Sequence, residues 1–250
     1  GGEREEALRT YVEQGGMPEP LVQEIDRVSY LRTLWDSILY KDIVRRHRIR
    51  SVAGIEDLAG YLLANVTSEY SLNRLTEVTQ VRSAHTVRKY LAHLEEAFLF
   101  FSLKRYSRKF REQARANRKI YCIDNGFVAA RGFQFTDKIG ALFENAVAIA
   151  LHKQSLDGKC EIYFWHGERG EEVDFVIKQG PRIVQLIQVC WDMRRAATRH
   201  REVRSLLQAS KALDCDNLLI LTAGTAGEED VEWFGTRRSI RLQPLAEWAG

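Results

Sequence analysis

The stretch that most constrains the fold of this chain runs from Glu171 to Asp192, EEVDFVIKQGPRIVQLIQVCWD. Two extended runs flank the turn residues Gly180 and Pro181, which predicts a β-hairpin. Side chains alternate between the two faces of a strand. The first run therefore has an apolar face of Val173, Phe175 and Ile177 and an opposite face of Glu172, Asp174 and Lys178.

The second run of the hairpin also carries polar residues among apolar ones. Gln188 and Cys190 alternate with Ile187, Val189 and Trp191, so the hairpin is expected to bring Asp174 and Gln188 onto one polar patch. Clustered oxygen ligands hold Mg²⁺ or Mn²⁺ against a phosphate. Glu144, on the helix expected just before the hairpin, offers a second carboxylate.

These residues define a candidate site. We expect Glu144, Asp174 and Gln188 as catalytic residues, with Asp174 and Glu144 as ligands of Mg²⁺ or Mn²⁺. The alternative interpretation is structural: both carboxylates are hydrogen-bonded inside a polar seam that holds no metal.

The composition narrows the class of protein. With 250 residues, 45% of them hydrophobic, the chain is long enough to bury a core divided between domains. No run approaches the roughly 18 apolar residues of a membrane span, and the first residues do not form a signal peptide, so we expect a cytoplasmic protein without membrane contact. The four cysteines and six histidines show no metal-ligand spacing.

The first half of the chain is expected to be helical. Residues 1–50 form a helical segment, in which the first helix ends at Gly15 and Gly16. Residues 51–118 contain three helical blocks, with Ser71 and Ser83 at N-cap positions, followed by the apolar run FLFFSLKRYS. This order is typical of a winged helix-turn-helix.

Positive charge is concentrated in the same region. Residues 81–119 hold eleven Lys or Arg and three Glu, although the net charge of the chain is only +3. A basic stripe of this kind favours a nucleic-acid partner, here duplex DNA bound mainly through its phosphates. The alternatives are a solvated charged face and a winged helix that packs only on protein. The expected contacts are Arg82, His85, Arg88 and Lys89 on the third helix and Lys104, Arg105, Arg108 and Lys109 in the wing.

Residues 119–250 show the pattern of an α/β domain with a mixed central sheet. A strand at 119–124 is followed by a helix at 137–154, a strand at 160–166 and the hairpin. A helix at 196–213, a strand at 217–223, an acidic loop at 227–232 and a strand at 239–245 complete it.

At this point the sequence resembles the PD-(D/E)XK restriction-endonuclease-like superfamily. Its pattern of an acidic helix residue, an Asp on one strand and (D/E)-x-K on the next falls on Glu144, Asp174 and Gln188-Val189-Cys190. Gln188 and Cys190 depart from that pattern, since the resemblance implies a carboxylate and an ammonium there. Lys178, Arg199 and Arg201 are candidates for the missing positive charge.

A wider resemblance covers almost the whole chain. YVEQGGMPEP, TVRKYLAHLEEAFLFFSLKRYS, IYCIDNGF, GALFENAVAIAL and EEVDFVI are similar to the C-terminal region of archaeal and bacterial AAA-type ATPases with a nuclease-like domain of unknown function. The P-loop pattern G-x-x-x-x-G-K-[ST] is absent, so ATP is not expected as a cofactor of this chain. The resemblance implies that residues 1–50 are the remnant of an ATPase lid or a linker.

Three functions follow as expectations. The first is a DNA-binding module that combines a winged helix with a nuclease-like domain of altered catalytic set. The second is an active Mg²⁺- or Mn²⁺-dependent endonuclease. The third is an interaction module that regulates an ATPase domain or subunit through residues 11–50.

Overall fold

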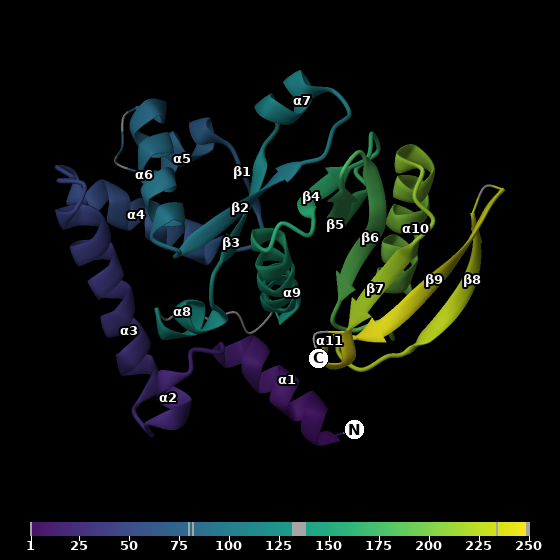
Figure 1. The fold of residues 1–250 in the computed structure, drawn as a ribbon, viewed down its shortest axis with the longest axis horizontal. Coiled ribbons are helices and arrows are strands. Elements are labelled where there is room, and N and C mark those ends of the chain that lie inside the picture. Colours follow the sequence, from purple (N-terminus) through teal and green to yellow (C-terminus); the bar gives the residue numbers. More distant parts are fainter. Residues whose placement is uncertain (1, 80, 82, 132–138, 234, 249–250) are drawn as a thin grey trace. The chain divides into compact units, whose positions relative to one another are not determined.

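The computed structural model describes residues 2–79, 81, 83–131, 139–233 and 235–248 (Figure 1). Contacts between residues group the chain into two compact units that interleave along the sequence. We call Thr10–Ser102 with Asn117–Asn145 the helical unit, and Gly1–Arg9, Leu103–Ala116 and Ala146–Gly250 the sheet unit. The expected domain bounds at residues 50 and 118 stay a prediction.

The first N-terminal helix ends at the residues that the sequence predicts. The helix α1 ends where Gly15 adopts φ +81°, and the Gly16 N–H donates to Asp124 Oδ2 at 2.8 Å. Asp26 caps α3 by accepting from the Ser29 N–H at 2.8 Å, and a π-helix, η1, continues directly from α3. The bounds are α1 Gly2–Gln14, α2 Glu19–Val22, α3 Arg27–Ser37 and η1 Ile38–Arg45.

The three helices expected after residue 50 are confirmed and lie together in the helical unit (Figure 1). Ser71 caps α5 by accepting from the Arg74 N–H at 3.2 Å, whereas Ser83 holds the N-cap position of α6 without a side-chain bond. The strand β1 pairs antiparallel with β3. The bounds are α4 Val52–Ala64, β1 Glu69–Tyr70, α5 Leu72–Val78, α6 Ala84–Glu96, β2 Phe100–Arg105, β3 Arg118–Cys122 and α8 Asn125–Ala130.

Aromatic side chains form the centre of the helical unit. The Trp35 ring meets Phe100 edge-on, with ring centroids 5.8 Å apart, and meets Phe127 at 5.4 Å. Figure 1 shows α3, which carries Trp35, running beside α8, which carries Phe127. The helix α3 therefore buries the apolar face that carries Trp35.

The sheet unit confirms a mixed α/β architecture with a mixed sheet. Its strands are ordered β2-β4-β5-β6-β7-β9-β8, and β4, β5 and β6 are antiparallel while β6, β7 and β9 are parallel. The helix α10 lies along β5 and β6 (Figure 1). The bounds are α7 Phe110–Arg115, α9 Ile139–Leu156, β4 Glu161–His166, β5 Glu172–Gln179, β6 Arg182–Cys190, α10 Ala196–Leu213, β7 Leu218–Thr222, β8 Gly227–Trp233, β9 Thr236–Pro244 and α11 Leu245–Trp248.

One expected loop is a strand. The acidic residues 227–232 form most of β8, which pairs antiparallel with β9. Its carboxylates find partners on neighbouring elements: Glu229 pairs with Arg199, and Asp230 pairs with Arg237 at 3.1 Å. Charged residues suit an edge strand because they discourage pairing with another chain. Their charge alone wrongly indicated a loop.

Among the described residues, no helix is both long enough and apolar enough to cross a membrane.

Candidate carboxylate site and nucleic-acid interface

The predicted hairpin forms as expected, from β5 and β6. In its register Phe175 lies opposite Ile187, and Gly180 turns with φ +55°. The Asp174 N–H donates to Gln188 Oε1 at 3.3 Å. Asp174 and Gln188 are 7% and 6% exposed, so the predicted juxtaposition is confirmed as a buried one. Its catalytic role stays a prediction.

A third polar residue, Glu202 of α10, completes this cluster. The Gln188 side-chain amide donates to Glu202 Oε2, and Glu202 is 3% exposed. The sequence pattern did not place Glu202 in this cluster. The signal that locates it is helical spacing, because Glu202 precedes the buried residues Leu206, Ala209 and Leu213 on one stripe of α10.

The positive charge at the cluster comes from Arg201. Its Nε lies 3.0 Å and its terminal nitrogen 2.5 Å from Glu202 Oε1. Of the other two candidate cations, Lys178 pairs with Glu161 and Arg199 pairs with Glu229. Arg201 is therefore the candidate that contacts Glu202.

Cys190, at the position where the resemblance implies an ammonium, remains a neutral thiol at neutral pH. Burial, and secondarily the charge of Glu202, raises the pKa of Cys190 to about 11. A neutral thiol supplies neither a positive charge nor a thiolate ligand. The cluster thus depends on Arg201 for its cationic group.

The cluster offers ligand types that suit a divalent cation, but its Glu202 carboxylate is already paired with protein groups. Asp174, Glu202 and the Gln188 amide offer the oxygen ligands that Mg²⁺ prefers. However, Glu202 Oε2 accepts from Gln188 and Oε1 accepts from Arg201. Binding of Mg²⁺ to Glu202 therefore requires Arg201 to move, which its 73% exposed side chain allows.

Glu144 belongs to the helical unit and has partners there. Its Oε1 accepts from Lys119 Nζ at 3.0 Å and from the Tyr121 hydroxyl at 2.8 Å. The next residue, Asn145, bonds both backbone groups of Cys122 at 2.9 Å. These contacts attach α9 to β3, so Glu144 has a structural role, and its role as a metal ligand stays a prediction.

The predicted wing lines a cavity of about 810 Å³ in the sheet unit. Arg105 donates to the His166 carbonyl at 3.0 Å, and Arg108 donates to the Ala212 carbonyl at 3.4 Å. A guanidinium has five N–H donors, so both retain donors for a ligand. The side chains that supply charge and aromatic surface to this cavity are Arg105, Arg108, Arg169, Tyr106, Trp165 and His166.

A smaller cavity of about 180 Å³ is lined by Arg201, the residue that pairs with Glu202 of the carboxylate cluster. It shares Arg169 and Glu171 with the large cavity and is also lined by Arg201 and Arg204. Backbone hydrogen bonds, and after them the ion pair with Arg204 at 3.0 Å, hold the pKa of Glu171 below its usual range. Because the two cavities share these residues, they belong to one basic surface, and this surface extends to Arg201, the residue next to Glu202.

The remaining predicted nucleic-acid contacts that the structure describes are exposed. His85, Arg88 and Lys89 lie on the exposed face of α6 in the helical unit. Lys104 and Lys109 are exposed in the sheet unit, where Lys109 pairs with Glu112 at 2.9 Å. Arg82 lies outside the described residues.

Two relatives of this chain are described only as uncharacterized proteins. An uncharacterized protein of Methanocaldococcus jannaschii is 27% identical over 97% of this chain and 55% of its own length. An uncharacterized protein of Haemophilus influenzae is 29% identical over 73% of this chain and 46% of its own length. The chain thus spans about half the length of the curated relatives it matches.

A solved structure gives a weaker likeness. The half-complex from a tetradecameric assembly of Thermococcus gammatolerans McrB AAA+ hexamers with bound McrC is 10% identical and has a TM-score of 0.29. The match covers 78% of this chain and 47% of that chain. The TM-score is too low to assign a shared fold.

Two families match successive parts of the chain. Residues 139–239 match a domain of unknown function, DUF4143, which is often a C-terminal domain of AAA-type ATPases and supports an ATPase-associated module. Residues 5–137, more than half of the chain, match another domain of unknown function, DUF8612. The chain therefore belongs to the DUF8612 family.

Proposed function

We propose that this chain is a nucleic-acid-binding module that works with an AAA-type ATPase domain or subunit, and that duplex DNA is its partner. The observation that carries the proposal is the cavity of about 810 Å³, in which three arginines converge with Tyr106 and Trp165. Arginine binds phosphate oxygens with paired N–H groups. Aromatic rings beside it offer a surface on which bases stack where a strand separates or ends.

The balance of charge in the cavity supports an anionic ligand. Two of its carboxylates already have cationic partners, because Glu112 pairs with Lys109 and Glu171 pairs with Arg204. Arg105, Arg108 and Arg169 are then available for the phosphate groups of a backbone.

The helical unit supports the same proposal through a different surface. The order α4, β1, α5, α6, β2, β3 and the antiparallel pairing of β1 with β3 support a winged helix as part of this proposal. On α6 the apolar residues Val87 and Leu94 are buried, and Arg88 and Lys89 are exposed where a groove would meet them. We propose these residues as backbone contacts rather than as readers of base sequence.

Fluorescence anisotropy with a labelled duplex and a labelled single strand, at low and moderate salt, tests the proposal. Arg169→Ala and Arg108→Ala are each expected to weaken duplex binding by roughly 5- to 10-fold at low salt and to reduce the salt slope by about one. Arg237→Ala is the matched control, because Arg237 is an exposed arginine of the same unit outside both cavities. Absence of binding at low salt, or equal losses in all three variants, contradicts the proposal.

A second candidate function is metal-dependent cleavage of phosphodiesters, and Glu202 is the observation that favours it. Glu202 brings a second carboxylate to the hairpin, where Gln188 stands in place of one. Asp174 and Glu202 would then hold Mg²⁺ or Mn²⁺, which stabilises charge on the attacking and leaving oxygens.

Nicking of supercoiled plasmid with Mg²⁺ or Mn²⁺ tests this candidate. The wild type is expected to nick the plasmid, and both Asp174→Ala and Glu202→Gln are expected to abolish nicking. If the three proteins behave alike, the cluster is not a cleavage site and the module only binds.

A further inference from the structure

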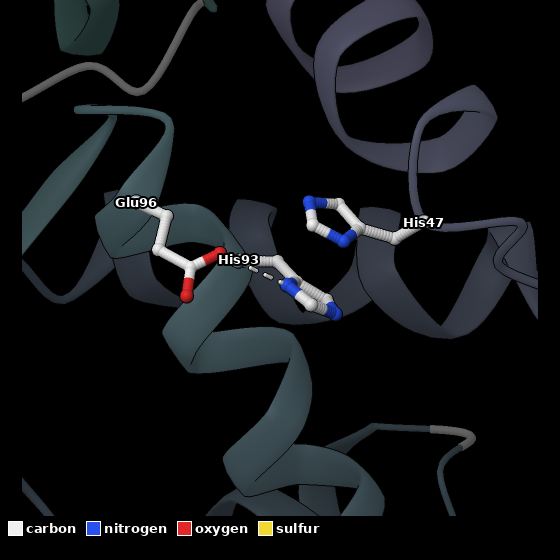
Figure 2. Close-up of side chains that lie close together, drawn as sticks. All are labelled: His47, His93 and Glu96. Carbon is white, nitrogen blue, oxygen red and sulfur yellow. Dashed lines mark hydrogen bonds and ion pairs between the residues drawn. The ribbon is translucent and has the colours of Figure 1, made fainter.

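Two histidines and a glutamate meet where η1 ends and α6 ends. His47 lies in the turn that follows η1, and His93 and Glu96 are three residues apart on α6, so they share one face of that helix. The two imidazole rings are stacked with centroids 3.6 Å apart and planes 21° apart. Figure 2 shows the rings facing one another with the Glu96 carboxylate beside His93. One ligand atom from each residue lies within 4.8 Å of the other two.

The His93 ring is held with one nitrogen unused. Its Nδ1 lies 3.4 Å from Glu96 Oε2, so this nitrogen and the carboxylate face one another. His93 is 8% exposed, and its Nε2 is buried without a hydrogen-bond partner in the part of the chain that the structure describes. The ring can therefore carry its proton on Nε2, which leaves the Nδ1 lone pair for an ion shared with Glu96.

We propose that His47, His93 and Glu96 bind a divalent transition-metal ion of the zinc class. Two imidazoles and one carboxylate suit this class, whereas Mg²⁺ prefers oxygen ligands. A tetrahedral site with bonds of about 2.0–2.1 Å separates its ligand atoms by about 3.4 Å, which is the distance already found between His93 and Glu96. His47 reaches the ion by rotating its ring about a soft torsion.

The ion would join two segments that are distant in sequence. It would link the turn after η1 to the C-terminal end of α6, the helix whose outer face carries Arg88 and Lys89. A fourth position would be left for water. The site is separate from the Asp174 cluster in both residues and ligand chemistry.

Calorimetric titration of the untagged full chain with Zn²⁺ tests the site. The variants are His47→Ala and Glu96→Gln, because both side chains are at least partly exposed and their loss leaves the core intact. His85→Ala is the matched control, since His85 is an exposed histidine at the other end of α6.

The wild type and His85→Ala are expected to bind Zn²⁺ at this site with equal affinity. His47→Ala and Glu96→Gln are expected to bind at least ~10-fold more weakly. Substitution with Co²⁺ is expected to give the d–d absorption of a tetrahedral nitrogen and oxygen site without a thiolate charge-transfer band. Equal Zn²⁺ affinities in the wild type, His47→Ala and Glu96→Gln, or no Zn²⁺ binding by the wild type, overturn the proposal.

Discussion

Two carboxylates that are largely shielded from solvent, Glu144 and Glu202, pair with cations of opposite exposure. The side chain of Glu144 is 15% exposed and pairs with Lys119, whose side chain is only 5% exposed. The side chain of Glu202 is 4% exposed and pairs with Arg201, whose side chain is 73% exposed. Each carboxylate also accepts one neutral hydrogen bond, from Tyr121 and from Gln188 respectively.

The difference lies in whether the cation can leave. Lys119 cannot move into water without opening the packing around β3 and α9, so Glu144 is fixed as a structural pair. Arg201 reaches solvent and can exchange Glu202 for a phosphate or give way to a metal ion. A carboxylate with a removable counter-ion is the better candidate for function, and it lies beside the basic surface of the two cavities.

The largest expected effect on the free energy of unfolding is at the ion pair of Lys119 with Glu144. Lys119→Met leaves Glu144 as a buried charge without its cation, which is expected to lower the free energy of unfolding by about 3–5 kcal/mol. Urea denaturation followed by circular dichroism measures it. A loss below about 1 kcal/mol would show that solvent reaches Glu144 and would remove the contrast between the two carboxylates.

A charge introduced beside Glu202 tests the hairpin cluster. Gln188→Glu replaces the amide donor with a third carboxylate beside Asp174 and Glu202, so we expect a loss of about 2 kcal/mol in the absence of divalent cations. Millimolar Mg²⁺ is expected to restore part of that loss by binding these carboxylates. Chemical denaturation with and without Mg²⁺ measures both quantities, with Gln185→Glu on the same strand as the control. Equal Mg²⁺ effects in the two variants would argue against a cation site.

Removal of the exposed cation is expected to cost little. Arg201→Ala leaves Glu202 its bond from Gln188 and lets water reach the vacated position, so the free energy of unfolding should fall by at most about 1 kcal/mol. The same denaturation experiment measures it beside Lys119→Met. A loss as large as that of Lys119→Met would mean that Arg201 is as structural as Lys119.

The smallest expected effect at neutral pH is that of Cys190, because its contribution to stability changes only in alkaline solution. Cys190 keeps its proton in the folded state up to about pH 11, but an unfolded chain loses it from about pH 9. The folded state thus binds more protons between these values, so stability falls as pH rises from 9 to 11. Cys190→Ala is expected to make this decline shallower than in the wild type. An unchanged decline would show that other groups, such as Tyr163 with its pKa of about 12, account for it.

The hairpin and the three helices could be predicted from sequence because local patterns encode them. The alternation through Val173 and Ile187, the turn at Gly180 and the cap at Ser71 depend on residues close in the chain. The strand β8 was missed because its carboxylates are paired by residues that come from α10 and β9.

The candidate site was only partly predictable for a related reason. Asp174 and Gln188 share one hairpin, so strand register relates them. Glu202 reaches Gln188 from a helix, and the cavity combines residues as distant as Arg105 and Gln208, which no local pattern relates. His47, in the turn after η1, and His93, on α6, are likewise far apart in the chain, so no local pattern indicates their contact.

The location of bound nucleic acid tests the central claim most directly. Photo-crosslinking with DNA that carries 5-iodouracil, followed by mass spectrometry of the peptides, maps the contact. The account predicts crosslinks at Tyr106 or Trp165, which line the basic cavity beside Arg105 and Arg169. Their loss is expected in Arg169→Ala but not in Arg237→Ala. Crosslinks confined to peptides outside the cavity, or none at low salt, would contradict the account.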